Sequence, residues 1–109
     1  MNIKINGLTW DVICVPSNDK KLYYDKTDCY GVTYFQEQEI YLDEELSVEL
    51  FRQTVIHELV HAFLFSFGYH LECDMVEEAV CDFAGSHLDK IYKTANKIVS
   101  HFFKGDSKS

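Results

Sequence analysis

The stretch that decides the fold is Thr54-Val-Ile-His-Glu-Leu-Val-His-Ala-Phe-Leu64. Within this mostly apolar segment the ionisable side chains are His57, Glu58 and His61. On an α-helix, residues four positions apart lie on one face about one turn from each other, so the two imidazoles would be neighbours. Ionisable groups on an otherwise apolar helix need a partner or a ligand, because burying them unpaired is costly.

The order His57-Glu58-x-x-His61 matches the helical motif of zinc peptidases, in which two histidines bind Zn²⁺ and the glutamate serves as general base. The alternative is a surface helix whose polar side happens to contain these residues. Such a helix would carry more polar residues on that side, whereas Leu64 and Phe65 lie near the histidines. The pattern therefore favours a metal site.

The composition indicates one domain spanning residues 1–109, with 47% hydrophobic residues to form a core. No apolar run approaches the ~20 residues of a membrane span, and the sequence Met-Asn-Ile-Lys-Ile-Asn lacks signal-peptide architecture, so we expect a cytoplasmic protein. The net charge of −8 and scattered lysines argue against nucleic-acid and anionic-membrane partners. We expect the polar tail 104–109 to be disordered.

The four cysteines do not form a Cys-x-x-Cys pair. Without a secretion signal, reduced thiols that pack as small apolar side chains are the favoured interpretation. A cysteine-based zinc site is the weaker alternative. The residues concerned are Cys14, Cys29, Cys73 and Cys81.

The first half of the chain, about residues 2–42, predicts a small antiparallel sheet of three or four strands. Asn6-Gly7 is a strong signal for a tight hairpin turn, because both residue types tolerate positive φ. A second hairpin is expected from residues 29–35 and 39–42 around Gln36-Glu37-Gln38. The Tyr-rich segment 20–28 receives no assignment.

The second half, about residues 46–103, predicts helices. The first helix should run from near Ser47 to Phe67 and end at Gly68. One apolar stripe of this helix is expected to face the sheet, and the two histidines point away from it, most simply toward the next helix. The stripe consists of Val48, Phe51, Val55, Leu59 and Ala62.

The next helix should begin after Asp74, which forms a capping-box-like start with Glu77. Its apolar periodicity fits one long helix, or two with a break near Asp89-Lys90. The predicted buried stripe is Val76, Val80, Phe83, Ala84, Leu88 and Ile91, continuing through Ala95, Ile98 and Phe102.

A catalytic zinc site has three protein ligands and an open position for water. Glu78 is our candidate for the third ligand. Asp82, four residues later on the same helix face, would hydrogen-bond the free N–H of a zinc-bound imidazole. Glu77 competes for the ligand role, but its capping function already explains it. The alternative for the acidic pair is a solvated helix start.

These residues carry a resemblance to known proteins. His57-Glu58-Leu-Val-His61 followed by Glu78-Ala-Val-Cys-Asp82 resembles the gluzincin pattern, HExxH then ExxxD, of thermolysin-like peptidases. With the strand residues Gly31-Val-Thr-Tyr and the small size, the region from about residue 30 to 85 resembles the ImmA/IrrE metallopeptidases, in the short form encoded by phages and mobile elements. The resemblance implies cleavage of a repressor protein.

A peptidase also needs a donor for the developing oxyanion, and Tyr69 and His70 just past the first helix are candidates for oxyanion or substrate contacts. His87 and His101 read as structural. An extended substrate could add to an edge strand formed by residues 31–35 or 39–42.

The sequence thus predicts an α+β minimal zincin, in which a small antiparallel sheet packs on the HExxH helix and one or two helices follow. The predicted activity is zinc-dependent hydrolysis of a peptide bond in a protein substrate, with one catalytic Zn²⁺. The alternatives are a non-cleaving protein-binding module on a peptidase fold, and a structural metal or no metal.

Overall fold

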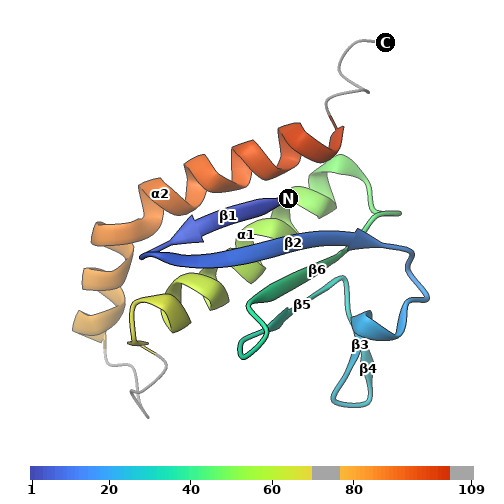
Figure 1. The fold of residues 1–109 in the computed structure, drawn as a ribbon. Coiled ribbons are helices and arrows are strands. Elements are labelled where there is room, and N and C mark those ends of the chain that lie inside the picture. Colours follow the sequence, from blue (N-terminus) through green and yellow to red (C-terminus); the bar gives the residue numbers. More distant parts are fainter. Residues whose placement is uncertain (70–76, 104–109) are drawn as a thin grey trace.

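A computed structural model describes residues 1–69 and 77–103. Figure 1 shows a sheet in one layer, with two helices packed behind it and along one side. The elements in chain order are β1 (Asn2–Ile5), β2 (Leu8–Val15), the short 3₁₀ turn η1 (Lys20–Leu22), β3 (Tyr23–Tyr24), β4 (Thr27–Asp28), β5 (Gly31–Tyr34), β6 (Glu39–Asp43), α1 (Val48–Ser66) and α2 (Glu77–Phe103).

Both predicted hairpins are confirmed. β1 and β2 pair antiparallel across Asn6 and Gly7, whose φ values are 50° and 82°. β5 and β6 pair antiparallel across a turn in which Gln38 has a φ of 55°. Positive φ at these turns matches the right-handed twist of the flanking strands.

The expectation of a purely antiparallel sheet is wrong at one pair. The strand order is β1-β2-β6-β5, and β2 runs parallel to β6, from Asp11 beside Glu39 to Val15 beside Asp43. The chain leaves β2 and passes through β3, β4 and β5 before β6 returns between β2 and β5. This crossover makes β1 and β5 the two edges of a mixed sheet.

The unassigned segment 20–28 forms η1 and a two-stranded ribbon. The Asp19 carboxylate accepts a hydrogen bond from the Lys21 N–H and caps η1. β3 and β4 pair through Tyr23 beside Asp28, and the ribbon projects at the lower right of Figure 1. Leu22 is buried, so it anchors the segment to the domain.

α1 begins and ends close to the predicted residues. The Ser47 hydroxyl accepts a hydrogen bond from the Leu50 N–H at 3.2 Å, and Gly68 follows the helix with a φ of 84°. Of the predicted stripe, Val48 is exposed, because it lies in the first turn beyond the edge of the core. The other four residues are buried, together with Trp10, Ile40 and Leu42 of the sheet.

α2 is one continuous helix in the described residues, and its predicted start at Asp74 lies outside them. Its buried positions are Phe83, His87, Ile91, Ala95 and Ile98. Val80 and Leu88 were predicted to be buried and are exposed. Position 88 is rotated by about 100° from position 87, and His87 takes the inward position against Phe63 and Phe67 of α1. Neither described helix is long and apolar enough to cross a membrane.

Candidate functional site

The two histidines of the HExxH segment form an accessible pair on α1. Their ring centroids are 5.0 Å apart, as expected for residues one turn apart. The His57 side chain is 69% exposed, and His61 is exposed as well. α2 packs against a different side of α1, through Phe63 and Phe67. The expectation that the next helix covers the imidazoles is therefore wrong for the described part of the chain.

Glu58 lies beside the histidine pair but points inward. Its side chain is only 7% exposed, and its Oε2 is 4.0 Å from the His57 Nε2. The Thr33 hydroxyl donates to the Glu58 Oε1 at 2.7 Å and lies 3.3 Å from the Glu58 carbonyl oxygen. A hydrogen bond from β5 thus fixes one carboxylate oxygen and lowers the cost of burying it.

Gly31 allows β5 to approach α1 at this position. A Cβ at residue 31 would lie 2.8 Å from the Thr54 Cγ2 and 3.0 Å from the Glu58 Cγ. Both distances are too short for ordinary side-chain contact, so only glycine fits without a shift of the helix or strand. Sequence reasoning did not identify Gly31 or Thr33 as site residues. The sequence signal that could have identified Gly31 is a glycine inside a predicted strand, which often marks a close approach of another part of the backbone.

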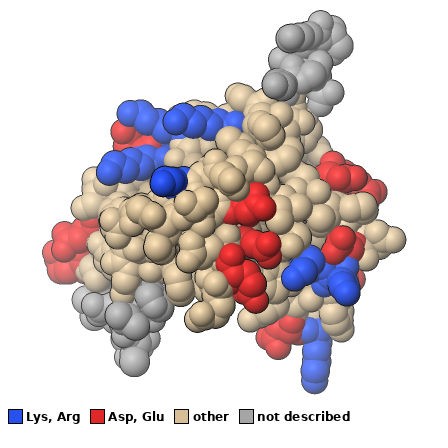
Figure 2. Space-filling view, in the orientation of Figure 1, with Lys and Arg blue, Asp and Glu red and all other residues tan. Residues whose placement is uncertain are grey.

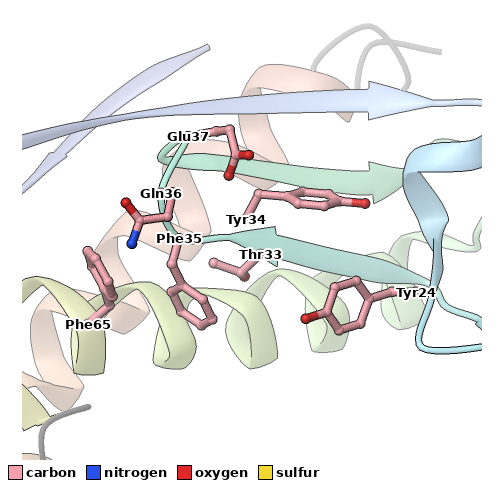
Figure 3. A pocket seen from close by; sticks show the side chains of 7 residues that line it. All are labelled: Tyr24, Thr33, Tyr34, Phe35, Gln36, Glu37 and Phe65. Atoms are coloured by element: carbon pink, nitrogen blue, oxygen red, sulfur yellow. The ribbon is translucent and has the colours of Figure 1, made fainter.

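Three adjoining hollows form a groove between β5 and α1. The central one, about 210 Å³, is lined by His57, Glu58 and His61. One of about 360 Å³ shares Gly31, His57 and Glu58 with it and extends toward Leu50. Another of about 370 Å³ shares Tyr24, Thr33 and Phe35 and extends to Phe65 (Figure 3). We call these three hollows the β5 groove.

The strand register directs free backbone groups of β5 away from its neighbour. The Asp43 N–H donates to the Tyr30 carbonyl at 2.9 Å, next to the pair of Gly31 with Leu42. In an antiparallel ladder hydrogen-bonded and non-hydrogen-bonded pairs alternate, so Gly31 and Thr33 direct their N–H and C=O groups away from β6. The edge of β5 can therefore accept another extended strand.

Aromatic side chains line or border the groove with unusual exposure. Tyr24 and Tyr30 are 57% and 56% exposed, and Phe35 is 39% exposed. Figure 3 shows Phe35 reaching from the β5–β6 turn toward α1, with Phe65 on one side and Tyr24 on the other. The Phe35 and Phe65 rings stack with centroids 5.2 Å apart. Clustered exposed aromatic rings are typical of binding surfaces.

The described residues do not group the predicted third ligand with the histidines. Glu77, Glu78 and Asp82 are exposed on the first turns of α2. Residues 1–69 and 77–103 contain no group of three or more His, Cys, Asp or Glu side chains placed to hold a metal ion. Among the predicted metal-site residues in this described part of the chain, the structure brings together His57, Glu58 and His61.

Of the two candidates for oxyanion or substrate contacts, Tyr69 and His70, the structure describes Tyr69, which does not line the β5 groove. Tyr69 packs its ring edge-on against Phe83, with centroids 5.1 Å apart, so it has a packing role. His70 lies outside the described residues.

Burial, with a contribution from Glu44, raises the pKa of Cys14 to about 12, and a protonated thiol is a poor metal ligand. Cys14, Cys29 and Cys81 are free thiols.

Comparison of the chain with protein-family models, with curated proteins and with solved structures finds no match.

Proposed function

We propose that this chain is a zinc-dependent metallopeptidase that cleaves an extended segment of a protein substrate. One observation carries the proposal: an exposed pair of imidazoles and a buried, hydrogen-bonded carboxylate lie at the base of a groove beside an open strand edge. A pair of possible metal ligands, a possible general base and a surface for a peptide backbone are parts of a metallopeptidase site, which needs one further ligand.

Two of the three ligand positions fit zinc. His57 and His61 present imidazole nitrogens from one face of α1. We propose Glu78 as the third ligand, with Glu77 as its alternative; both are exposed carboxylates in the first turn of α2 and would have to approach the imidazoles when zinc binds, because the described residues do not group them. Asp82, one turn later, would hydrogen-bond an imidazole N–H. A zinc ion bound there would polarise the scissile carbonyl and make water more acidic.

The groups of the chain itself have separate tasks. Glu58 accepts the proton of the attacking water and later passes it to the leaving amine. Thr33 holds the Glu58 Oε1 in place, so the carboxylate is oriented before substrate arrives. The outward backbone groups of Gly31 and Thr33 pair with the substrate backbone.

The groove also suggests the size and character of the substrate segment. From Leu50 to Phe65 α1 rises about 22 Å, which matches six or seven residues of extended chain. The hollow lined by Tyr24, Phe35 and Phe65 would hold one large apolar or aromatic side chain. The family resemblance suggests that the segment belongs to a repressor.

Three variants test the proposal. Glu58→Gln should retain bound zinc and lose cleavage, whereas His57→Ala and His61→Ala should each lose zinc. Zinc is measured by mass spectrometry of the purified protein, and cleavage by digestion of a mixture of unrelated peptides. Unchanged cleavage by Glu58→Gln would refute the mechanism, and absence of zinc after loading the wild type would refute the metal site.

A second candidate is a module that binds a protein segment without cutting it. The exposed aromatic rings and the open edge of β5 favour this function independently of any metal. Binding of a peptide that remains intact after long incubation with the zinc-loaded protein would support it. The presence of Glu58 at the base of the groove favours the peptidase.

A further inference from the structure

A further hollow lies at the opposite edge of the sheet, away from the β5 groove. Its volume is about 390 Å³, and it is formed by β1, the C-terminal part of α1 and the middle of α2. Ile5, Phe63 and Phe67 form its apolar lining. We call it the lysine groove, because Lys4, Lys90, Lys93 and Lys97 line it.

The charge of this groove contrasts with that of the whole chain. The chain carries 10 Lys and Arg against 18 Asp and Glu, and four of those ten basic residues line this one hollow. From Lys90 to Phe103, α2 has three lysines and no acidic residue. Figure 2 shows blue side chains gathered at the upper left, where α2 and β1 lie in Figure 1.

The gathering of four lysines around one hollow depends on the fold as well as on the sequence. Lys90, Lys93 and Lys97 recur at helical spacing and share a face of α2, but Lys4 reaches them only through the fold. An acidic partner within this cluster is Asp89, which pairs with Lys93 at 3.1 Å. Both side chains of that pair are at least 70% exposed, so water weakens their attraction and the pair can exchange for another carboxylate.

We propose that the lysine groove binds an acidic segment of a partner protein, with carboxylates along its rim and an apolar side chain against Phe67. Four positive charges around a short hollow match a few carboxylates. A nucleic acid or a lipid surface is a longer polyanion, which the net charge of −8 would repel over the rest of the surface. This proposal does not depend on the peptidase function.

The test uses a fluorescein-labelled peptide of about twelve residues, built from Glu, Asp, Leu and Phe, and the same peptide with Gln and Asn in place of the acids. Fluorescence anisotropy should show binding of the acidic peptide that weakens between about 50 and 300 mM salt, as Debye screening requires. The neutral peptide should bind at least about tenfold more weakly.

A matched pair of double variants locates the binding. Lys93→Glu with Lys97→Glu should weaken binding about tenfold or more. Lys20→Glu with Lys26→Glu changes the net charge equally, at η1 and the β3–β4 turn, and should retain it. The milder change of Lys93 and Lys97 to Gln should give an intermediate loss, and unfolding midpoints check that every variant folds.

Several results would overturn the proposal. An equal loss in both double variants would show a general effect of net charge or binding in the β5 groove. Tighter binding of a single-stranded DNA oligonucleotide or of phosphatidylserine vesicles, lost in the Lys93 and Lys97 variant, would assign the groove to a polyanion. Dimerisation that depends on these lysines in sedimentation would assign it to a second copy.

Discussion

The Thr33 hydroxyl donates a hydrogen bond of 2.7 Å to the Glu58 Oε1, linking an edge strand to the carboxylate between the two histidines. Thr33 and Glu58 are 25 residues apart, so only the docking of β5 on α1 creates this contact. The acid–base residue of the proposed site therefore belongs to the core as well as to the groove.

Replacing Thr33 by Val should destabilise the protein by about 1.5–3 kcal/mol, because a buried carboxylate oxygen loses its donor. Thr33→Ser keeps the hydroxyl and should cost much less. Urea unfolding of the three proteins at neutral pH measures the difference. Equal stabilities of the Val and Ser variants would show that the hydrogen bond contributes little.

Gly31→Ala should destabilise the protein by about 1–3 kcal/mol, because the new methyl group would lie 2.8 Å from the Thr54 Cγ2. Adding Thr54→Ser removes that methyl group and keeps the hydroxyl that donates to the Leu50 carbonyl. The double variant should recover part of the loss, seen as non-additivity in a double-mutant cycle. Strictly additive losses would contradict the close packing of β5 on α1.

Phe35→Ala should alter substrate choice if the hollow lined by Tyr24, Phe35 and Phe65 receives a substrate side chain. A segment pairing antiparallel with β5 places its amino-terminal part near Phe35, so large apolar residues should be enriched on that side of the cut bond. Cleavage sites in a peptide mixture, read by mass spectrometry, should show this preference in the wild type. The preference should fall about five- to tenfold in Phe35→Ala and persist in Phe35→Leu. A preference unaffected by Phe35→Ala would exclude this hollow.

His87 should make stability depend on pH. Burial among the rings of Phe63, Phe67 and Phe83, with a smaller effect of Lys90, lowers the His87 pKa below its usual 6.5. Its Nδ1 has no hydrogen-bond partner within the described residues. The folded state thus favours neutral His87, and this contribution is complete above pH 6.5. It is lost as pH falls below 6.5 toward the folded-state pKa, by at most about 1.4 kcal/mol per pH unit.

Comparison with His87→Leu isolates this contribution. Between pH 7.5 and 5.5, about one unit either side of the usual His pKa, wild type should lose more free energy of unfolding than the variant. Other titrating groups are common to both proteins and cancel in the difference. Parallel pH profiles would show that His87 titrates normally.

Local signals accounted for much of the fold. The turn at Asn6-Gly7, the cap at Ser47 and the stop at Gly68 act on adjacent residues, and each lies where the sequence placed it. The parallel pairing of β2 with β6 depends on residues far apart in the chain, and hairpin signals carry no information about it.

In the candidate site, too, local sequence predicted some contacts, and others depend on tertiary packing. Helical periodicity alone put His57 beside His61. The contacts of Glu58 with Thr33 and Gly31 arise from tertiary packing, and nothing in the local sequence specified them. The predicted buried face of α2 differs from the observed one at position 88. Apolar periodicity favoured Leu88 as the buried residue, whereas in the structure His87 is buried, with its flat imidazole against the ring of Phe67.

The placement of β6 between β2 and β5 also implies an order in which the contacts of the chain form during folding. α1 and each hairpin rest on local contacts, so they can form before the distant β2–β6 pairing. A chain folded only that far would already hold both imidazoles side by side, but the carboxylate between them would lack its donor from β5. The hydrogen bond that orients the Glu58 carboxylate would thus form later than the pairing of the two histidines along α1.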